Sequence, residues 1–360
     1  MKICIIGGGN IGTLCAVELA AKGCDVMIYT SRPETWSTTL SVYDAEDRLL
    51  WKTDAVRPTS DLASAVCGAE QIWITHPAFL FESLCEKLLP LVRPDQMLLV
   101  IPGSGGAEFA FRPLLRKGVV LCGLQRVHSI ARLKEKGKSV YMLGRKPSLS
   151  LGAIPAAAAP RWAAEMTRLL DIPCASLTNY LSVTLTPSNP ILHTSRLYSM
   201  FRDYAPGVTW DHNIGFYVEW TDEASAVMIA CDAELRALCK SLPLDLSAVQ
   251  SLRVYYESDT AEKMTAKLRS IRAFRDIASP MKRTEAGWIP DFDSRYFTAD
   301  FPFGLKIIRD IGALAGIEMP TINRLWDWYV HTACCPGARC FELTLQTRDE
   351  LVRIYSDESD

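Results

Sequence analysis

Three glycines near the N-terminus, Gly7, Gly9 and Gly12, have the spacing of a turn that holds the pyrophosphate of a dinucleotide. In such a turn the first glycine permits a tight exit from a strand, the second leaves room for the pyrophosphate, and the third allows close packing of the next helix. The main-chain N–H groups of Asn10, Ile11 and Gly12 open that helix, where the helix dipole favours negative charge. These residues favour a dinucleotide site; the alternative is a glycine-rich turn without a ligand.

The segments on both sides of the turn have the order that the motif requires. Residues 3–6 are apolar and predict a strand, residues 11–22 are rich in Ala and Leu and predict a helix, and residues 25–29 predict a second strand. Gly23 ends the helix between them. Because the motif occurs in this β-α-β context, a dinucleotide site is the favoured hypothesis for the N-terminal part of the chain.

The three residues after the second strand, Thr30, Ser31 and Arg32, bear on which dinucleotide binds. An NAD site normally has Asp or Glu here, which accepts hydrogen bonds from the ribose 2′-hydroxyl. Two hydroxyls and a guanidinium can instead bind the oxygens of a 2′-phosphate through charge-assisted hydrogen bonds. We therefore expect NADP(H) as the preferred cofactor and NAD(H) as the second choice; the alternative for Arg32 is a solvated loop residue.

Predicted strands and helices continue to alternate up to residue 184, which indicates a doubly wound parallel sheet of the Rossmann type. Two loops fall at the carboxyl ends of predicted strands, where an open α/β sheet binds its ligands. One contains Thr75, and the other begins with Pro102 and Gly103 and can bring main chain close to the nicotinamide. Residues 1–184 are therefore expected to form an NADP-binding domain; the alternative for the second loop is an ordinary flexible turn.

The pattern changes after Thr184 and becomes almost entirely helical. Apolar residues recur at helical spacing from 215 to 242, which predicts a long core helix. Residues 185–360 are therefore expected to form a second, helical domain. The predicted fold class is α/β, with an N-terminal Rossmann-type doubly wound parallel sheet and a C-terminal all-helical domain.

Composition excludes several classes of protein. The 360-residue chain has a formal net charge of −2, so it has no electrostatic footprint for nucleic acid or an anionic membrane. No charge-free apolar run is long enough to span a membrane, and the N-terminus is itself the first predicted strand rather than a signal peptide. The 12 cysteines are scattered and indicate buried thiols in a reducing cytoplasm. Cys334, Cys335 and Cys340 lack the spacing of a zinc site, so no metal is expected.

Three titratable residues of the second domain could do chemistry. His193 lies in the first turn of a predicted helix, and Arg295 and Asp300 lie before a Phe-Pro-Phe-Gly turn. Histidine exchanges protons near neutral pH, and arginine can hold a carboxylate through two hydrogen bonds. Taken alone, His193 in this position is more often structural than catalytic, and Arg295 and Asp300 more often belong to a salt-bridged loop.

Around these residues the chain resembles the opine dehydrogenases, and the resemblance extends over nearly its whole length. Its most specific segments are residues 185–193 (LTPSNPILH), residues 219–237 with Cys231 to Glu234, and residues 294–321, which begin Ser-Arg-Tyr-Phe. The resemblance implies that His193 is the acid/base residue, that Asp300 pairs with it, and that Arg295 binds a substrate carboxylate.

The resemblance also implies a reaction. An α-keto acid such as pyruvate condenses with the amino group of an amino acid, and NAD(P)H reduces the imine to an N-(carboxyalkyl)amino acid. The amine must be neutral to attack, so a base that titrates near the working pH is needed, and histidine meets this requirement. An adjacent aspartate would fix the imidazole tautomer and stabilise its protonated form.

One departure from the family narrows the choice of amino acid. An octopine-forming member has a glutamate just after the strand that matches residues 119–123, whereas this chain reads Leu-Gln-Arg-Val-His over residues 124–128. Since an acid is missing, a neutral or polar amino acid is expected rather than a basic one. Arg126 and His128 are further candidates for substrate binding; the alternative is that both pack at the domain boundary.

Two other functions stay open from the sequence. A ketopantoate- or hydroxyacid-type NADP reductase would act on C=O without an amine, and a non-catalytic sensor would bind NADP(H) without turnover. Small molecules are the expected partners in each case. The identity of the amino acid and the oligomeric state stay open, a homodimer included.

Overall fold

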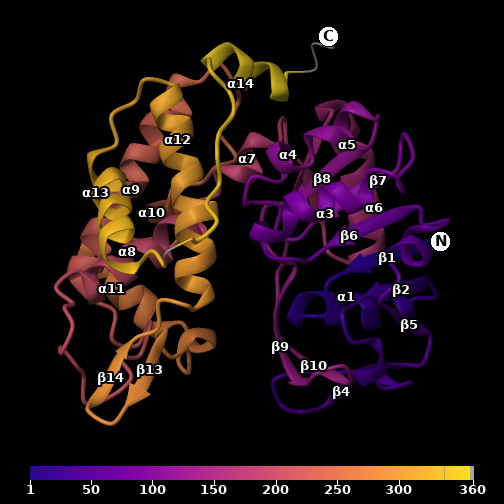
Figure 1. The fold of residues 1–360 in the computed structure, drawn as a ribbon, viewed down its shortest axis with the longest axis horizontal. Helices are drawn as coiled ribbons and strands as arrows, with labels where there is room; N and C mark the ends of the chain where they lie inside the picture. The colour runs from indigo at the N-terminus through magenta and orange to yellow at the C-terminus, as the bar shows by residue number, and fades with distance from the viewer. Residues whose placement is uncertain (336, 357–360) are drawn as a thin grey trace. The chain divides into compact units, whose positions relative to one another are not determined.

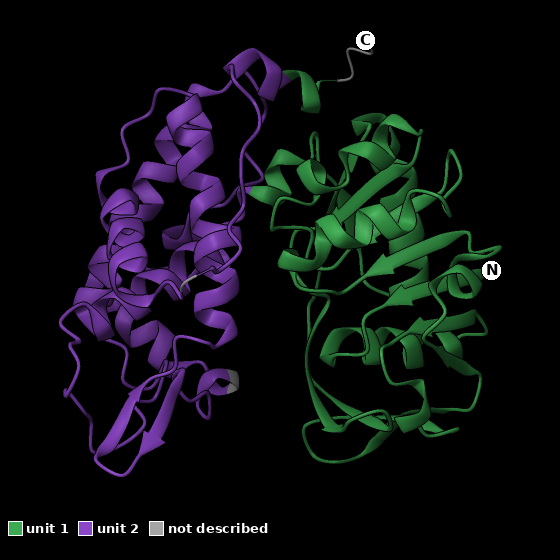
Figure 2. Cartoon of the chain, viewed as in Figure 1, with its two compact units in different colours: residues 1–184, 353–360 green, residues 185–352 purple. Residues whose placement is uncertain are grey.

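The chain divides into two compact units, each with its own apolar core. The computed structural model describes residues 1–335 and 337–356, apart from the side chain of Ala273. The first unit holds Met1–Thr184 together with the C-terminal residues from Arg353 onward, and the second holds Leu185–Val352. Figure 1 shows the course of the chain, and Figure 2 distinguishes the two units by colour.

An eight-stranded sheet forms the centre of the first unit. Its strands are β1 (Lys2–Ile6), β2 (Asp25–Tyr29), β5 (Val56–Thr59), β6 (Gln71–Ile74), β7 (Met97–Val100), β8 (Val120–Leu124), β11 (Leu149–Ile154) and β12 (Cys174–Ser176). The order is β12-β11-β8-β7-β6-β1-β2-β5, and every pair is parallel except β11 with β8. Strands β6 and β7 are buried along their whole length, as expected for a parallel sheet covered on both faces. The predicted Rossmann-type sheet is confirmed.

Seven α-helices within residues 1–184 and a second sheet surround the strands of the described first unit. The helices are α1 (Asn10–Ala21), α2 (Leu62–Val66), α3 (Phe81–Leu88), α4 (Ala107–Ala110), α5 (Arg112–Arg116), α6 (Ala159–Leu170) and α7 (Leu181–Thr184). The second sheet contains β3 (Leu40–Tyr43), β4 (Leu49–Thr53), β9 (Ser129–Glu135) and β10 (Ser139–Arg145), in the order β4-β3-β10-β9. Its strands come from two distant parts of the chain, and the parallel pair of β3 with β10 joins these parts.

Helix α1, which follows the glycine turn, packs between the two sheets. It contacts β1 and β2 of the large sheet and all four strands of the small one. Every residue from Gly12 to Ala20 is therefore buried, including the charged side chain of Glu18. A carboxylate that has lost its water in this way is stable only if it is paired.

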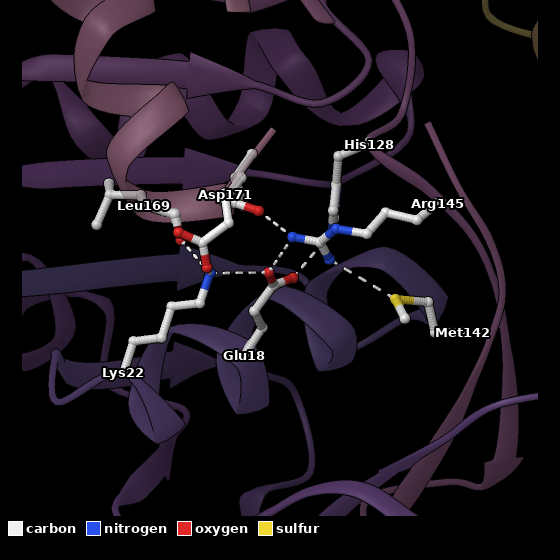
Figure 3. A network of polar contacts seen from close by, with 8 residues as sticks. Glu18, Lys22, His128, Met142, Arg145, Leu169 and Asp171 are labelled. Carbon is white, nitrogen blue, oxygen red and sulfur yellow. Dashed lines mark hydrogen bonds and ion pairs between the residues drawn. The ribbon is translucent and has the colours of Figure 1, made fainter. Parts of the chain in front are cut away.

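Glu18 is surrounded by basic side chains, as Figure 3 shows. The Arg145 guanidinium donates to Oε1 at 2.8 Å, and the Lys22 ammonium lies 3.2 Å from the same oxygen. Nε2 of His128 lies 3.5 Å from Oε2. Burial alone would raise the pKa of Glu18, but the contacts with His128 and Arg145 outweigh it and lower the pKa to about 2. The ionised carboxylate thus fastens α1 to β10.

Replacing Glu18 with glutamine should destabilise the protein by about 3–5 kcal/mol at pH 7, because the cations around it lose their counter-charge. The carboxyl pKa is lower in the folded state than its ordinary value of 4.5, so its contribution is complete above that value and is lost as pH falls toward 2. Urea unfolding of both proteins at several pH values would measure this. The difference in unfolding free energy should narrow between pH 5 and pH 2.

A matched control is Glu135→Gln, since Glu135 pairs with Lys138 at 2.9 Å but both side chains are more than half exposed. Exposed pairs contribute about 0–1 kcal/mol. Equal decreases in the unfolding free energy of the Glu18 and Glu135 variants would contradict the role given to the buried carboxylate.

The second unit is helical apart from one hairpin. Its α-helices are α8 (Thr194–Phe201), α9 (Asp222–Ser241), α10 (Leu252–Tyr255), α11 (Ala261–Ser270), α12 (Lys306–Leu314), α13 (Pro320–Trp328) and α14 (Arg348–Tyr355), the last of which runs on into the first unit. Three wider π-helical segments are η4 (Ser188–His193), η6 (Tyr296–Leu305) and η7 (Tyr329–Ala333). Strands β13 (Met281–Thr284) and β14 (Gly287–Pro290) pair antiparallel and correct the expectation of an all-helical domain.

The end of the chain returns to the first unit, whereas the sequence predicted that residues 185–360 would stay in the second; residues 357–360 lie outside the described part. The hydroxyl of Tyr355 donates to Glu108 at 2.8 Å, and Thr184 also bonds this carboxyl. Burial raises the pKa of Glu108 to about 7. This contact explains why the chain from Arg353 belongs to the first unit.

Among the described residues, no helix has the length and apolar character needed to cross a membrane.

Candidate active site

Of the three motif glycines between β1 and α1, two are closely surrounded by other atoms and one is not. Gly7 has a φ of +117°, and a Cβ there would lie 2.6 Å from Oγ1 of Thr75. A Cβ on Gly12 would overlap the carbonyl oxygen of Gly7. A Cβ on Gly9, in contrast, would meet no atom within 4 Å. Gly7 and Gly12 are therefore needed for the turn itself, whereas Gly9 leaves space beside the chain.

This space fits the pyrophosphate of a nicotinamide dinucleotide. Gly9 is the N-cap of α1 and supplies no side chain to bond the first N–H groups of the helix. A helix leaves its first N–H groups without partners inside the helix, and its dipole favours an anion there. The side chain of Asn10 is engaged elsewhere, because its Oδ1 accepts from the Leu133 N–H at 2.9 Å. Asn10 and Ile11 therefore offer their main chain rather than their side chains to a ligand.

The loop after β6 supports the turn from the side. The hydroxyl of Thr75 lies 3.2 Å from the carbonyl oxygens of both Ile6 and Gly7. Next to it, the His76 ring lies against Gly7, where a Cβ would be 2.9 Å from its Cδ2. Burial, together with the charge of Lys87, holds the pKa of His76 below its ordinary value. A neutral imidazole thus packs beside the turn, and Thr75 keeps the turn in shape.

The residues after β2 leave polar groups exposed near the turn. Ser31 and Arg32 are exposed, Thr30 is half-buried, and the Arg32 guanidinium forms no hydrogen bond or ion pair in the described part of the chain. Trp36 packs against the turn, because a Cβ on Gly8 would lie 2.6 Å from the indole Cζ2 and 3.3 Å from Oγ1 of Thr30. The sequence analysis did not predict the position of Trp36.

The loop after β7 offers less than expected. Gly103 is buried, and a Cβ there would lie 2.6 Å from the Gly123 Cα and 3.0 Å from the hydroxyl of Tyr180. Its carbonyl oxygen accepts from that hydroxyl at 2.8 Å. Gly103 therefore serves the packing of this loop against β8. Pro102 is exposed, and its contact with a cofactor stays a prediction.

His193 and Asp300 meet in the second unit. Nδ1 of His193 lies 2.8 Å from Oδ2 of Asp300, and the two side chains are 14% and 16% exposed. Nε2 lies 3.2 Å from the hydroxyl of Tyr217. The rings of Phe216 and Tyr296 pack on the imidazole at centroid distances of 5.4 and 4.9 Å. The histidine is thus held by a carboxylate on one nitrogen and a phenol on the other, within aromatic walls.

Both members of this pair stand in π-helical segments. His193 ends η4, and Asp300 lies in η6, which also contains Pro302. Such wide turns are rare, and they occur frequently at functional sites. The two segments pack closely at Gly304, where a Cβ would lie 3.1 Å from Cγ of Pro190. A larger residue at position 304 would therefore push the two segments apart.

Arg295 begins the segment that carries Asp300. It is exposed and is the N-cap of η6, and its guanidinium forms no hydrogen bond or ion pair among the described residues. Its neighbour Tyr296 packs on His193. A guanidinium free of acidic partners at this place is suited to bind a carboxylate.

The two residues predicted to bind substrate after β8 differ in their surroundings. Arg126 is half-buried. The His128 side chain is fully buried in the first unit beside Glu18, which favours the alternative of a packed residue, and its role in substrate binding stays a prediction. A histidine next to a strand end has the same sequence signal whether it faces a ligand or a buried carboxylate.

Tyr217 is the site residue that the sequence analysis missed. It lies in an irregular stretch before α9, whereas the apolar spacing predicted a helix from residue 215. The N-cap Thr221, whose hydroxyl accepts from the Ala224 N–H at 3.2 Å, could have indicated the later start.

In the described residues, no group of three His, Cys, Asp or Glu side chains is placed to hold a metal ion.

Two family models match the chain in sequence order. Residues 2–149 match the N-terminal domain of NAD-dependent glycerol-3-phosphate dehydrogenase, and residues 176–332 match the "NAD/NADP octopine/nopaline dehydrogenase, alpha-helical domain". The second match contains His193, Tyr217, Arg295 and Asp300.

Individual proteins resemble the chain over most of its length. The octopine dehydrogenase of Mizuhopecten yessoensis is 25% identical, over 91% of this chain and 89% of its own. A solved structure of octopine dehydrogenase with NADH and L-arginine superposes with a TM-score of 0.80 at 23% identity, covering 92% of this chain and 89% of the other. Yersinopine dehydrogenase with NADP+ bound gives 0.67 at 14% identity, covering 98% and 97%. The helical-domain match, which contains the His193–Asp300 pair, and the sequence likeness to octopine dehydrogenase over most of the chain support the opine dehydrogenase family, and the solved structures show the same fold.

Proposed function

We propose that the chain joins an α-keto acid to the amino group of an amino acid by reductive condensation, with NAD(P)H as the reductant. The observation that carries this proposal is the 2.8 Å contact between His193 and Asp300 in the unit that matches the octopine/nopaline dehydrogenase model. The relatives named for opine formation support the same reaction. Pyruvate is the keto acid that the family suggests.

His193 is proposed to take the proton that the amino acid must lose before it attacks the carbonyl carbon. Asp300 accepts from Nδ1–H, so the lone pair lies on Nε2, and the carboxylate charge stabilises the imidazolium that forms. The same imidazolium can return a proton to the carbinolamine hydroxyl, which leaves as water when the imine forms. The bound dinucleotide supplies the hydride that reduces the imine. Arg295 is proposed to hold a substrate carboxylate through two parallel hydrogen bonds.

The amino acid is proposed to be neutral or polar. No acid lies in the segment 124–128 to pair with a cationic side chain. By contrast, a solved structure of octopine dehydrogenase holds L-arginine, which is a basic amino acid.

The chain is proposed to act in the cytoplasm, because its 12 cysteines are all free thiols. A homodimer is the proposed assembly.

An amino-acid by keto-acid matrix, assayed by NADPH and NADH oxidation, tests the reaction. Opine formation requires that neither substrate alone consumes the reduced cofactor and that a pair does. Oxidation of NADPH by a keto acid alone, unchanged by any amino acid, would instead indicate a reductase that acts on C=O. Cofactor binding without turnover for any pair would indicate a sensor.

The cofactor preference is proposed to be NADPH over NADH, and it depends on Arg32. Arg32→Ala should weaken NADPH binding by about 10- to 100-fold, since one charge-assisted contact to the 2′-phosphate is lost. NADH binding should not change, because NADH has no phosphate there. Fluorescence titration of both cofactors measures the two constants. Equal effects on NADPH and NADH would show that Arg32 does not contact the 2′-phosphate.

A further inference from the structure

The hydrogen bonds of His193 assign its protons. A carboxylate can only accept, so Nδ1 carries the hydrogen that bonds Asp300 at 2.8 Å. In the neutral ring Nε2 then has the lone pair, and the Tyr217 hydroxyl, 3.2 Å away, donates to it. Nε2 has only one acceptor position, in the plane of the ring. The nitrogen that must exchange protons is therefore already covered by a phenol.

Tyr217 is held in this place by its ring. The ring stacks on Phe274 at a centroid distance of 4.2 Å and an angle of 22°, and on Trp220 at 5.8 Å and 12°. Only 5% of the residue is exposed. Moving the hydroxyl away from Nε2 would break these stacks. A phenylalanine could pack in the same way, so packing does not explain the hydroxyl.

We propose that Tyr217 is a catalytic residue that relays the proton between the substrate nitrogen and His193. The N–H bond of the substrate ammonium breaks as an O–H bond forms on Tyr217, and the former hydroxyl proton moves to Nε2. The positive charge ends on the imidazolium, next to Asp300, and the phenol is neutral before and after. The reverse sequence returns a proton to the carbinolamine. This proposal rests on the proposed function, because it needs an amine substrate.

The surroundings of the imidazole favour such a path over direct contact with water. The groups that face it are Asp300 and Tyr296 from η6, Tyr217 itself, and the apolar ring of Phe216. A phenol can donate to the neutral ring and accept from the imidazolium, so it satisfies Nε2 in both protonation states. A hydrogen bond to a charged group contributes more than one to a neutral group, which helps the proton to arrive.

Tyr217→Phe is the test, with Tyr198→Phe as the matched control. Tyr198 is a tyrosine of the same unit whose ring packs edge-on against Trp328, and its hydroxyl is not part of the site. Loss of the relay should lower kcat of the amine-dependent reaction by about 10- to 100-fold, part of the usual contribution of acid–base catalysis. The KM values, cofactor binding and Tm should not change. Tyr198→Phe should behave as the wild type.

Two further measurements separate a relay from a structural role. The deficit of Tyr217→Phe should shrink as pH approaches the pKa of the substrate ammonium, since the free amine has no proton to give. The double variant His193→Ala with Tyr217→Phe should be no slower than His193→Ala alone, because the two residues act as a unit. Wild-type kcat in Tyr217→Phe, a pH-independent deficit, or additive losses would each overturn the relay. Absence of amine-dependent turnover in the wild type would instead overturn the proposed function.

Discussion

Replacing His193 with alanine is expected to lower kcat by about 10²- to 10⁴-fold, the usual contribution of a positioned acid or base. The imidazole is the group in contact with both Asp300 and Tyr217, so its removal leaves the carboxylate and the phenol without the proton carrier between them. NADPH binding should not change, because the glycine turn belongs to the first unit and His193 to the second. Steady-state kinetics and NADPH fluorescence titration measure the two quantities.

His331→Ala is the control for this variant. His331 is exposed in η7, and its Nδ1 lies 2.6 Å from the carbonyl oxygen of Asp327, outside the site. The control should keep the wild-type kcat. If His193→Ala were as active as His331→Ala, another group would have to be the acid or base. If it lost NADPH binding as well, the loss of activity would say nothing about proton transfer.

The parts of the fold that follow from short-range steric rules could be predicted. Gly7 and Gly12 are close in sequence and touch each other's backbone, so their spacing alone indicates the turn. Strand β1 is a continuous apolar run after Lys2, as in a parallel strand that is buried on both faces, and β2 is apolar after Asp25 with alternate residues buried. The residues that make contact in these elements are close together in the sequence, so the sequence pattern alone was enough to predict them.

The small sheet could not be predicted in this way. Strand β3 pairs with β10, whose residues lie far along the chain, and the short strand β4 is largely exposed. Strand β3 alternates buried and half-buried residues as a strand does, but nothing in the sequence indicates its partner, because the pairing joins distant segments and depends on contacts with α1. The burial of His128 has the same origin, because it depends on Glu18 in a helix that only the folded sheets enclose.

The site in the second unit was predicted in its members but not in its arrangement. A resemblance to the family indicated His193, Arg295 and Asp300, whereas their residue types and positions alone favoured structural roles. The π-helical form of η4 and η6 depends on tertiary packing, such as the close approach of Gly304 to Pro190. Tyr217 was missed because apolar residues at helical spacing already begin before Asp222, where α9 starts, so residue 217 was assigned to the helix.

Gly12→Ala and Gly9→Ala should have different effects on folding but the same effect on cofactor binding. A methyl group added at position 12 would overlap the carbonyl oxygen of Gly7, and this is backbone that cannot move without opening the turn. Overpacking of this kind costs about 1–3 kcal/mol or more. Gly12→Ala should therefore lower Tm without ligand and also abolish NADPH binding.

Gly9→Ala should leave Tm nearly unchanged, because the added methyl meets no atom within 4 Å and the residue has a φ of −87°, which alanine adopts readily. The methyl would fill the space proposed for the pyrophosphate, so NADPH should no longer raise Tm as a bound ligand does. Thermal unfolding with and without NADPH distinguishes the two variants. A Gly9→Ala protein that NADPH stabilises as much as the wild type would show that the pyrophosphate lies elsewhere, and the glycines would then serve only the packing of α1.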